Sequence, residues 1–96
     1  RRYARSFGLG RAIDAVYRAW WWRLEGREAK GRREAATAVR HAQRRGLMLD
    51  LARAHEELAR CHAPTSANRR KHAIIAHDAF LASGALGLAA RVKTLY

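Results

Sequence analysis

The sequence predicts an all-α protein, a small bundle of three to four helices preceded by a basic, flexible N-terminal arm. Apolar residues recur at helical spacing along most of the 96 residues, alanine is frequent, and no strand-like alternation or internal repeat appears. Glycine and proline fall between the periodic segments, where turns are expected. We therefore expect one domain over 1–96, with the arm at 1–8 and helices at 9–25, 32–45, 47–62 and 67–92.

The arm carries three arginines, a serine and no acidic residue. This composition is typical of the end of a mitochondrial transit peptide, and Arg-x-Tyr followed by alanine is similar to a matrix-peptidase cleavage signal. Cys61 is the only cysteine, which rules out an internal disulfide and favours a reducing compartment. We expect a mitochondrial location, with the cytoplasm as the alternative.

The first predicted helix, 9–25, contains the most informative run of the chain. At 100° per residue one narrow stripe, the expected buried face, holds Ile13, Val16, Tyr17, Trp20 and Leu24. Three consecutive tryptophans cannot share that stripe. Trp21 falls at its border, and Trp22 points outward beside Arg11 and Arg18. An outward indole costs solubility, so we expect a partner to cover Trp22.

The second predicted helix, 32–45, has a poor apolar face and a strongly basic remainder. The apolar positions are Ala35, Ala38, Val39 and Ala42, and the basic ones are Arg32, Arg33, Arg40, Arg44 and Arg45. We expect that burial alone does not hold such a helix and that it lies against an anionic partner. Gly31 is expected in a bend before this helix, and Gly46 as its C-terminal cap.

The third predicted helix, 47–62, has a clean apolar stripe of Leu47, Leu51, Ala54, Leu58 and Cys61. Two opposite-charge pairs at i,i+4 spacing, Arg53 with Glu57 and Glu56 with Arg60, are expected on its outer side. Pro64 ends this helix. Thr65, Ser66 or Asn68 is expected to cap the next one.

The fourth predicted helix, 67–92, opens with three cations, Arg69, Arg70 and Lys71, which oppose the helix dipole and therefore favour a docked anion. Residues 73–90 are apolar on nearly every side, so we expect burial in protein or contact with lipid. Gly84 and Gly87 are expected to permit close helix contact. The run is 18 residues long and contains Asp78, which argues against a membrane span.

Charge identifies the expected partner class. The formal net charge is +12, with 17 arginines against three lysines; residues 1–46 carry +9, residues 47–63 carry −1 and residues 64–96 carry +4. Arginine forks fit phosphates and carboxylates, which favours nucleic acid, anionic lipid or an acidic protein. We expect RNA or another anion to bind at Arg11, Arg18, Trp22, Arg32, Arg33, Arg40, Arg44, Arg45, Arg69, Arg70 and Lys71. Trp22 is expected either to stack on an unpaired base or to anchor a protein neighbour.

No constellation for chemistry is predicted. The five histidines and Cys61 lack the spacing of a zinc site, so we expect no metal. Cys61 and His62 diverge on a helix and form no dyad, and no phosphate-binding loop follows a strand. We expect a protein without enzymatic activity or cofactor.

Val16-Tyr17-Arg18-Ala19-Trp20 resembles the Leu-Tyr-Arg signature on the first helix of LYR-motif mitochondrial proteins, with valine in place of leucine. The resemblance covers about residues 13–24, and the downstream phenylalanine usual in that family is missing between Phe7 and Phe80. It implies a basic helical bundle, with Val16, Tyr17 and Arg18 as the motif and acyl carrier protein as a partner.

Two hypotheses follow from the sequence. The first is a non-catalytic structural subunit of a large organellar assembly, foremost a mitochondrial ribosome, in contact with rRNA and neighbouring subunits. The alternative is an accessory or LYR-type subunit of a respiratory or ATP synthase complex of the inner membrane, with membrane contact through 73–90.

Overall fold

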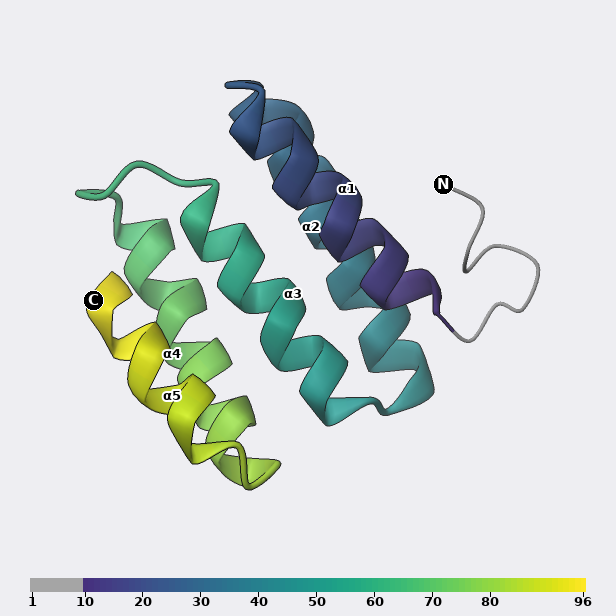
Figure 1. The fold of residues 1–96 in the computed structure, drawn as a ribbon, viewed down its shortest axis with the longest axis vertical. Coiled ribbons are helices and arrows are strands. Elements are labelled where there is room, and N and C mark those ends of the chain that lie inside the picture. The colour runs from purple at the N-terminus through teal and green to yellow at the C-terminus, as the bar shows by residue number, and fades with distance from the viewer. Residues whose placement is uncertain (1–9) are drawn as a thin grey trace.

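The computed structural model describes residues 10–96, so the predicted arm at 1–8 lies outside the described part. The described chain is all-α, as predicted, but it has five α-helices rather than three to four (Figure 1). They are α1 (Arg11–Leu24), α2 (Glu28–Arg45), α3 (Met48–Arg60), α4 (Ala67–Ala82) and α5 (Leu86–Val92). A 3₁₀ turn, Lys93–Leu95, closes the chain.

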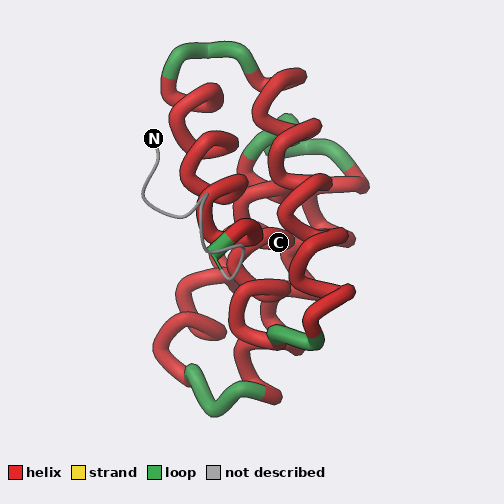
Figure 2. Tube along the Cα trace, turned by 90° about the vertical axis from the view of Figure 1, so that its right-hand side faces the viewer, coloured by secondary structure: helices red, strands yellow, loops and turns green. Residues whose placement is uncertain are grey.

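The helices form two hairpins, α1–α2 and α3–α4, and α3 is the helix through which the two hairpins pack together. α1 packs along α2, both contact α3, and α4 packs on α3 from the other side (Figure 1). α5 and the 3₁₀ turn fold back on α4. Short loops join the helices at the ends of the bundle (Figure 2). This arrangement leaves one long face of the α1–α2 hairpin without a covering helix.

The buried face of α1 consists of three alanines and Asp14. The predicted stripe is wrong for Tyr17, Trp20 and Leu24, while Ile13 and Val16 are half-buried. Ala12, Ala15 and Ala19 are fully buried, whereas Tyr17, Trp20 and Leu24 are 52%, 46% and 59% exposed. Ala15 packs with Ala38 of α2 and Ala54 of α3, and Ala19 packs with Ala35 and Leu58. Small side chains on facing helices bring the backbones together, which leaves no room between them for an indole or phenol.

Gly31 marks the closest approach of α1 and α2. A Cβ atom built on it would lie 3.1 Å from the carbonyl oxygen of Ala19 and 2.9 Å from Sγ of Cys61. The residue therefore lies inside α2, which begins at Glu28, four residues earlier than predicted. The turn falls instead at Glu25–Arg27, where Gly26 has a φ of +79°.

The apolar face of α2 is the predicted one: Ala35, Ala38 and Ala42 are buried and Val39 is half-buried. Ala38 lies against Ala15 of α1 and Ala54 of α3, and Ala35 lies against Ala19 and Leu58, so α2 packs on both neighbouring helices. Gly46 adopts the left-handed conformation, with a φ of +66°, and ends α2 as predicted.

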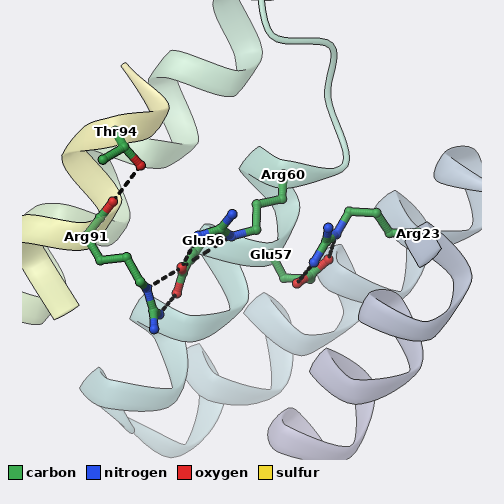
Figure 3. Close-up of polar contacts among 6 residues, drawn as sticks. All are labelled: Arg23, Glu56, Glu57, Arg60, Arg91 and Thr94. Atoms are coloured by element: carbon green, nitrogen blue, oxygen red, sulfur yellow. Dashed lines mark hydrogen bonds and ion pairs between the residues drawn. The ribbon is translucent and has the colours of Figure 1, made fainter.

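In α3 the stripe is partly confirmed, since Ala54, Leu58 and Cys61 are buried and Leu47 and Leu51 are half-buried. Glu56 and Glu57, however, are buried rather than on the outer side. Glu57 does not pair with Arg53; it accepts hydrogen bonds from Nε and Nη2 of Arg23, at 2.5 and 3.2 Å (Figure 3).

Glu56 binds two arginines, one of α3 and one of α5, at one carboxylate. It keeps the predicted pair with Arg60 at 2.9 Å and also accepts from Nε and Nη2 of Arg91, at 3.0 and 2.5 Å (Figure 3). Glu56 and Glu57 therefore tie α5 and α1 to α3 by charged hydrogen bonds.

The single predicted helix over 67–92 is wrong, because Ser83–Ala85 forms a turn in which Gly84 has a φ of +78°. Ser66 caps α4 by accepting from the amide of Asn68 at 3.1 Å. Gly84 and Gly87 make no close helix contact. The core of this half is built on Phe80, Val92 and Leu95.

Residues 73–90 are less buried than predicted, because Ile74, Leu81 and Leu86 are exposed. Among residues 10–96, no helix has the length and apolar character needed to cross a bilayer.

The close contact at Gly31 yields a stability prediction. Gly31→Val should lower the free energy of unfolding by about 1–3 kcal/mol, because the new side chain must displace Cys61 or move α1. Gly87→Ala is the matched control: its Cβ meets open space, and the change should be neutral or stabilising by up to ~1 kcal/mol. Urea unfolding monitored by circular dichroism measures both, and equal effects would contradict the close packing.

The carboxylate of Glu56 yields a second stability prediction. Glu56→Gln should lower the free energy of unfolding by about 1–2 kcal/mol, because it weakens two charged pairs whose arginines remain partly exposed to water. Asp78→Asn, at a carboxylate whose side chain is 72% exposed, serves as control and should have little effect. A Glu56→Gln variant as stable as the control would show that the pairs do not hold α5.

Candidate nucleic-acid interface

Folding neutralises few of the cationic side chains. Among residues 10–96, four arginines form ion pairs with carboxylates: Arg18, Arg23, Arg60 and Arg91. Residues 1–9 contain no acidic residue that could pair with the others. The cations without an ion pair in the described part are Arg11, Arg27, Lys30, Arg32, Arg33, Arg40, Arg44, Arg45, Arg53, Arg69, Arg70, Lys71 and Lys93.

Several of them gather along the α1–α2 hairpin. Arg33, Arg40 and Arg44 are exposed and lie on one stripe of α2, at i, i+7 and i+11. Burial lowers the pKa of His41, and the charges of Arg44, Arg11, Arg40 and Arg18 lower it further. The arginines of both helices therefore surround one imidazole. We call Arg11, Arg18, Arg33, Arg40 and Arg44 the α1–α2 basic surface.

Trp22 lies near the beginning of α2, next to this surface. Nζ of Lys30 lies 4.4 Å from its ring centroid and Cζ of Arg27 lies 5.4 Å from it. Trp22 is half-buried and lines a hollow of about 290 Å³ with Lys30, Arg33, Glu34 and Thr37. The prediction of a fully outward Trp22 is therefore wrong: cations of α2 and the preceding turn cover part of the ring.

Four of the predicted anion-binding arginines have hydrogen-bond partners inside the molecule. Nη2 of Arg40 donates to the hydroxyl of Thr37 at 3.0 Å. Arg18 pairs with Asp14 and with Glu34, the latter at 3.0 Å. Arg32 donates to the carbonyl of Cys61 at 3.1 Å, and Arg69 to that of His62 at 3.2 Å. These two arginines supply donors to carbonyls just beyond the end of α3, where a helix lacks them.

The remaining predicted residues do not form one continuous site. Arg45 is exposed at the end of α2, and Arg70 and Lys71 are exposed in the first turn of α4. α3 lies between α4 and the α1–α2 hairpin (Figure 1). The charge concentrated on the hairpin is thus separate from that on α4.

The sequence reasoning missed a second hollow, of about 380 Å³, between α1 and α3. The α1 side is lined by Val16, Tyr17, Trp20 and Arg23, and the other side by Arg53, Glu56, Glu57, Arg60 and Arg91. The signal that would have found it is the i, i+3, i+7 spacing of Ala12, Ala15 and Ala19, a small-residue face that turns Trp20 outward.

Three imidazoles stack between α3 and α4. Nδ1 of His55 and Nδ1 of His72 lie 3.1 Å apart, and the ring centroids of His62 and His72 are 5.8 Å apart. Burial lowers the pKa of His55 to about 4, with smaller contributions from His72 and Lys71. Within residues 10–96, no group of three side chains has the geometry to hold a metal ion.

Cys61 is buried, and burial with the charge of Glu57 raises the pKa of its thiol to about 12. Its Sγ lies 3.7 Å from Oε2 of Glu57. A thiol with that pKa is protonated at neutral pH and is not a nucleophile.

Comparison with models of protein families, with curated proteins and with solved structures finds no match for this chain. The interpretation of the site therefore depends on its geometry and charge.

The histidine stack predicts how stability depends on pH. The folded pKa of His55 is below its unfolded value near 6.5, so the unfolded chain binds more protons between about pH 6.5 and 4. The contribution of neutral His55 to the free energy of unfolding should be fully present above pH 6.5. As the pH drops to 4, this contribution should decrease by about 3 kcal/mol. Urea titrations at several pH values measure it, and His55→Gln should flatten the dependence. An unchanged slope in that variant would contradict the assignment.

Proposed function

We propose that this protein is a non-catalytic structural subunit that binds RNA backbone through the α1–α2 basic surface. The observation that carries the proposal is the row Arg33, Arg40 and Arg44, three exposed arginines on one stripe of α2 that take part in no ion pair among residues 10–96. Adjacent phosphates are the ligands that such a row of guanidinium groups recognises best.

The convergence of α1 and α2 supports the same ligand. Arg11 of α1 forms no ion pair among residues 10–96 and comes close enough to lower the pKa of His41, so unpaired positive charge is present on both helices. Clustered like charge costs folding free energy unless an anion neutralises it. An RNA backbone supplies many phosphates at regular spacing and would offset that cost.

The assembly that we favour is an organellar ribosome, in which small basic helical subunits contact rRNA and one another. The basic composition and the arm at 1–8, typical of the end of a transit peptide, support a mitochondrial location. Arg70 and Lys71 on α4 would then contact a second RNA segment, since α3 separates them from the hairpin.

The alternative is an accessory or LYR-type subunit of an inner-membrane respiratory or ATP synthase complex, with acyl carrier protein as a partner. One observation favours it: α1 leaves Trp20, Trp21 and Leu24 about half exposed, as a helix that docks on protein would. The exposed Leu81 and Leu86 would be the places for membrane contact.

A salt titration of RNA binding tests the proposal. The logarithm of the affinity should fall linearly with the logarithm of salt concentration. Replacing Arg33, Arg40 and Arg44 together with alanine should reduce that slope by about three, roughly one for each lost phosphate contact. Lys93→Ala, an exposed cation on the final 3₁₀ turn, is the control and should leave the slope nearly unchanged.

A different result of the same titration would contradict the proposal. An unmodified protein that fails to bind RNA at low salt, and that co-purifies with acyl carrier protein or detergent-solubilised complexes, would overturn the proposal in favour of the alternative.

A further inference from the structure

We infer that the hollow between α1 and α3 binds an unpaired nucleotide, with the base on Trp20 and its phosphate on Arg53. The inference rests on the proposed function, since it takes RNA as the ligand and assigns a second, single-strand-specific site. We call this feature the Trp20 hollow. From α1 it is lined by Val16, Tyr17, Trp20 and Arg23, and from α3 and α5 by Arg53, Glu56, Glu57, Arg60 and Arg91.

Trp20 is better suited to stacking on a base than Trp22. It is 46% exposed and lines a hollow of about 380 Å³, a size typical of sites for small ligands such as one nucleotide. Among the described residues, Lys30 and Arg27 lie over the ring of Trp22, whereas no cation lies over Trp20. Aromatic faces open to solvent stack on bases of any sequence.

Charge complementarity identifies the ligand as an anion. Four arginines and two carboxylates line the hollow, which leaves an excess of positive charge. Glu56 and Glu57 are buried and already accept hydrogen bonds from Arg23, Arg60 and Arg91 (Figure 3). Arg53 is exposed and forms no ion pair among residues 10–96, so it is the guanidinium that remains to bind a phosphate.

Two other occupants fit less well. A second copy of the chain would bring another net charge of +12 to an arginine-lined surface. An amphipathic helix needs an apolar groove for anchors several turns apart, whereas the apolar wall here covers little more than one turn of α1 and faces arginines. One base with its phosphate matches an aromatic wall opposite a cationic wall.

The test uses the full chain with two probes, a short single-stranded RNA of mixed sequence and a blunt RNA duplex with the same number of phosphates. Trp20→Ala should weaken single-strand binding by about 5–100-fold at fixed salt, because one stacked base is lost. Duplex affinity should change by less than about twofold. Trp20→Phe should retain most of the single-strand affinity, because a smaller aromatic face remains.

Two further variants keep the test sharp. Arg53→Ala removes a cation that takes part in no ion pair of the described fold, so it should weaken single-strand binding several-fold without unfolding the chain. Leu81→Ala removes an exposed apolar side chain on α4, away from the hollow, and should alter neither probe. Circular dichroism of each variant checks the fold.

Several results would overturn the inference. If Trp20→Ala weakens both probes equally, or neither, the Trp20 hollow is not a single-strand site, although duplex binding would leave the proposed function standing. If Trp20→Ala instead abolishes binding of an acidic amphipathic peptide and spares RNA, the occupant is protein. Absence of all RNA binding by the unmodified chain would overturn the proposed function and this inference together.

Discussion

The structure depends on the close approach of α1 and α2, which only small side chains permit. Ala15 and Ala19 face Ala38 and Ala35, and Gly31 brings the backbone of α2 against the carbonyl of Ala19. Alanines bury little area each, so the energy of this interface comes from many close contacts between backbones. The same constraint forces every large side chain of α1 to the border or the outside, and it thereby creates the exposed aromatic surface.

Some of the cationic side chains of residues 10–96 stabilise the fold, and the others have no ion-pair partner within that range. Two buried carboxylates on α3 hold arginines of α1, α3 and α5, and two more arginines supply donors beyond the end of α3. Apart from Arg18, the other lysines and arginines of residues 10–96 form no ion pair, and the sequence as a whole has 20 lysines and arginines against eight acidic residues. Repulsion among the surplus positive charges destabilises the isolated protein at low salt, and a bound anion relieves this repulsion.

The sequence predicted helix locations better than helix faces. Periodicity and the cap at Gly46 located α2 and α3 to within a few residues, because such signals are local. The phase of α1 could not be predicted from the spacing of its large apolar residues, because the close contact with α2 and α3 admits alanine and excludes tryptophan and tyrosine. The break at Gly84 was missed because apolar residues continue on both sides of it.

The sequence predicted which kinds of residue form the candidate site, but it did not predict how the fold brings them together. Arg33, Arg40 and Arg44 are where a helix over 32–45 would place them. The partners of Arg32 and Arg69 are backbone carbonyls that only the tertiary fold brings within reach. The Trp20 hollow combines residues of α1, α3 and α5, a combination that no local pattern encodes.

Cys61 lies at the end of α3, and its sulfur is close to both Gly31 of α2 and the buried carboxylate of Glu57. Because this thiol is protonated and buried, an alkylating reagent reaches the sulfur only when α2 moves away from α3. Alkylation of Cys61 therefore reports on the separation of these two helices. The rate of that alkylation measures how often α2 separates from α3, and a ligand that holds these two helices together would lower it.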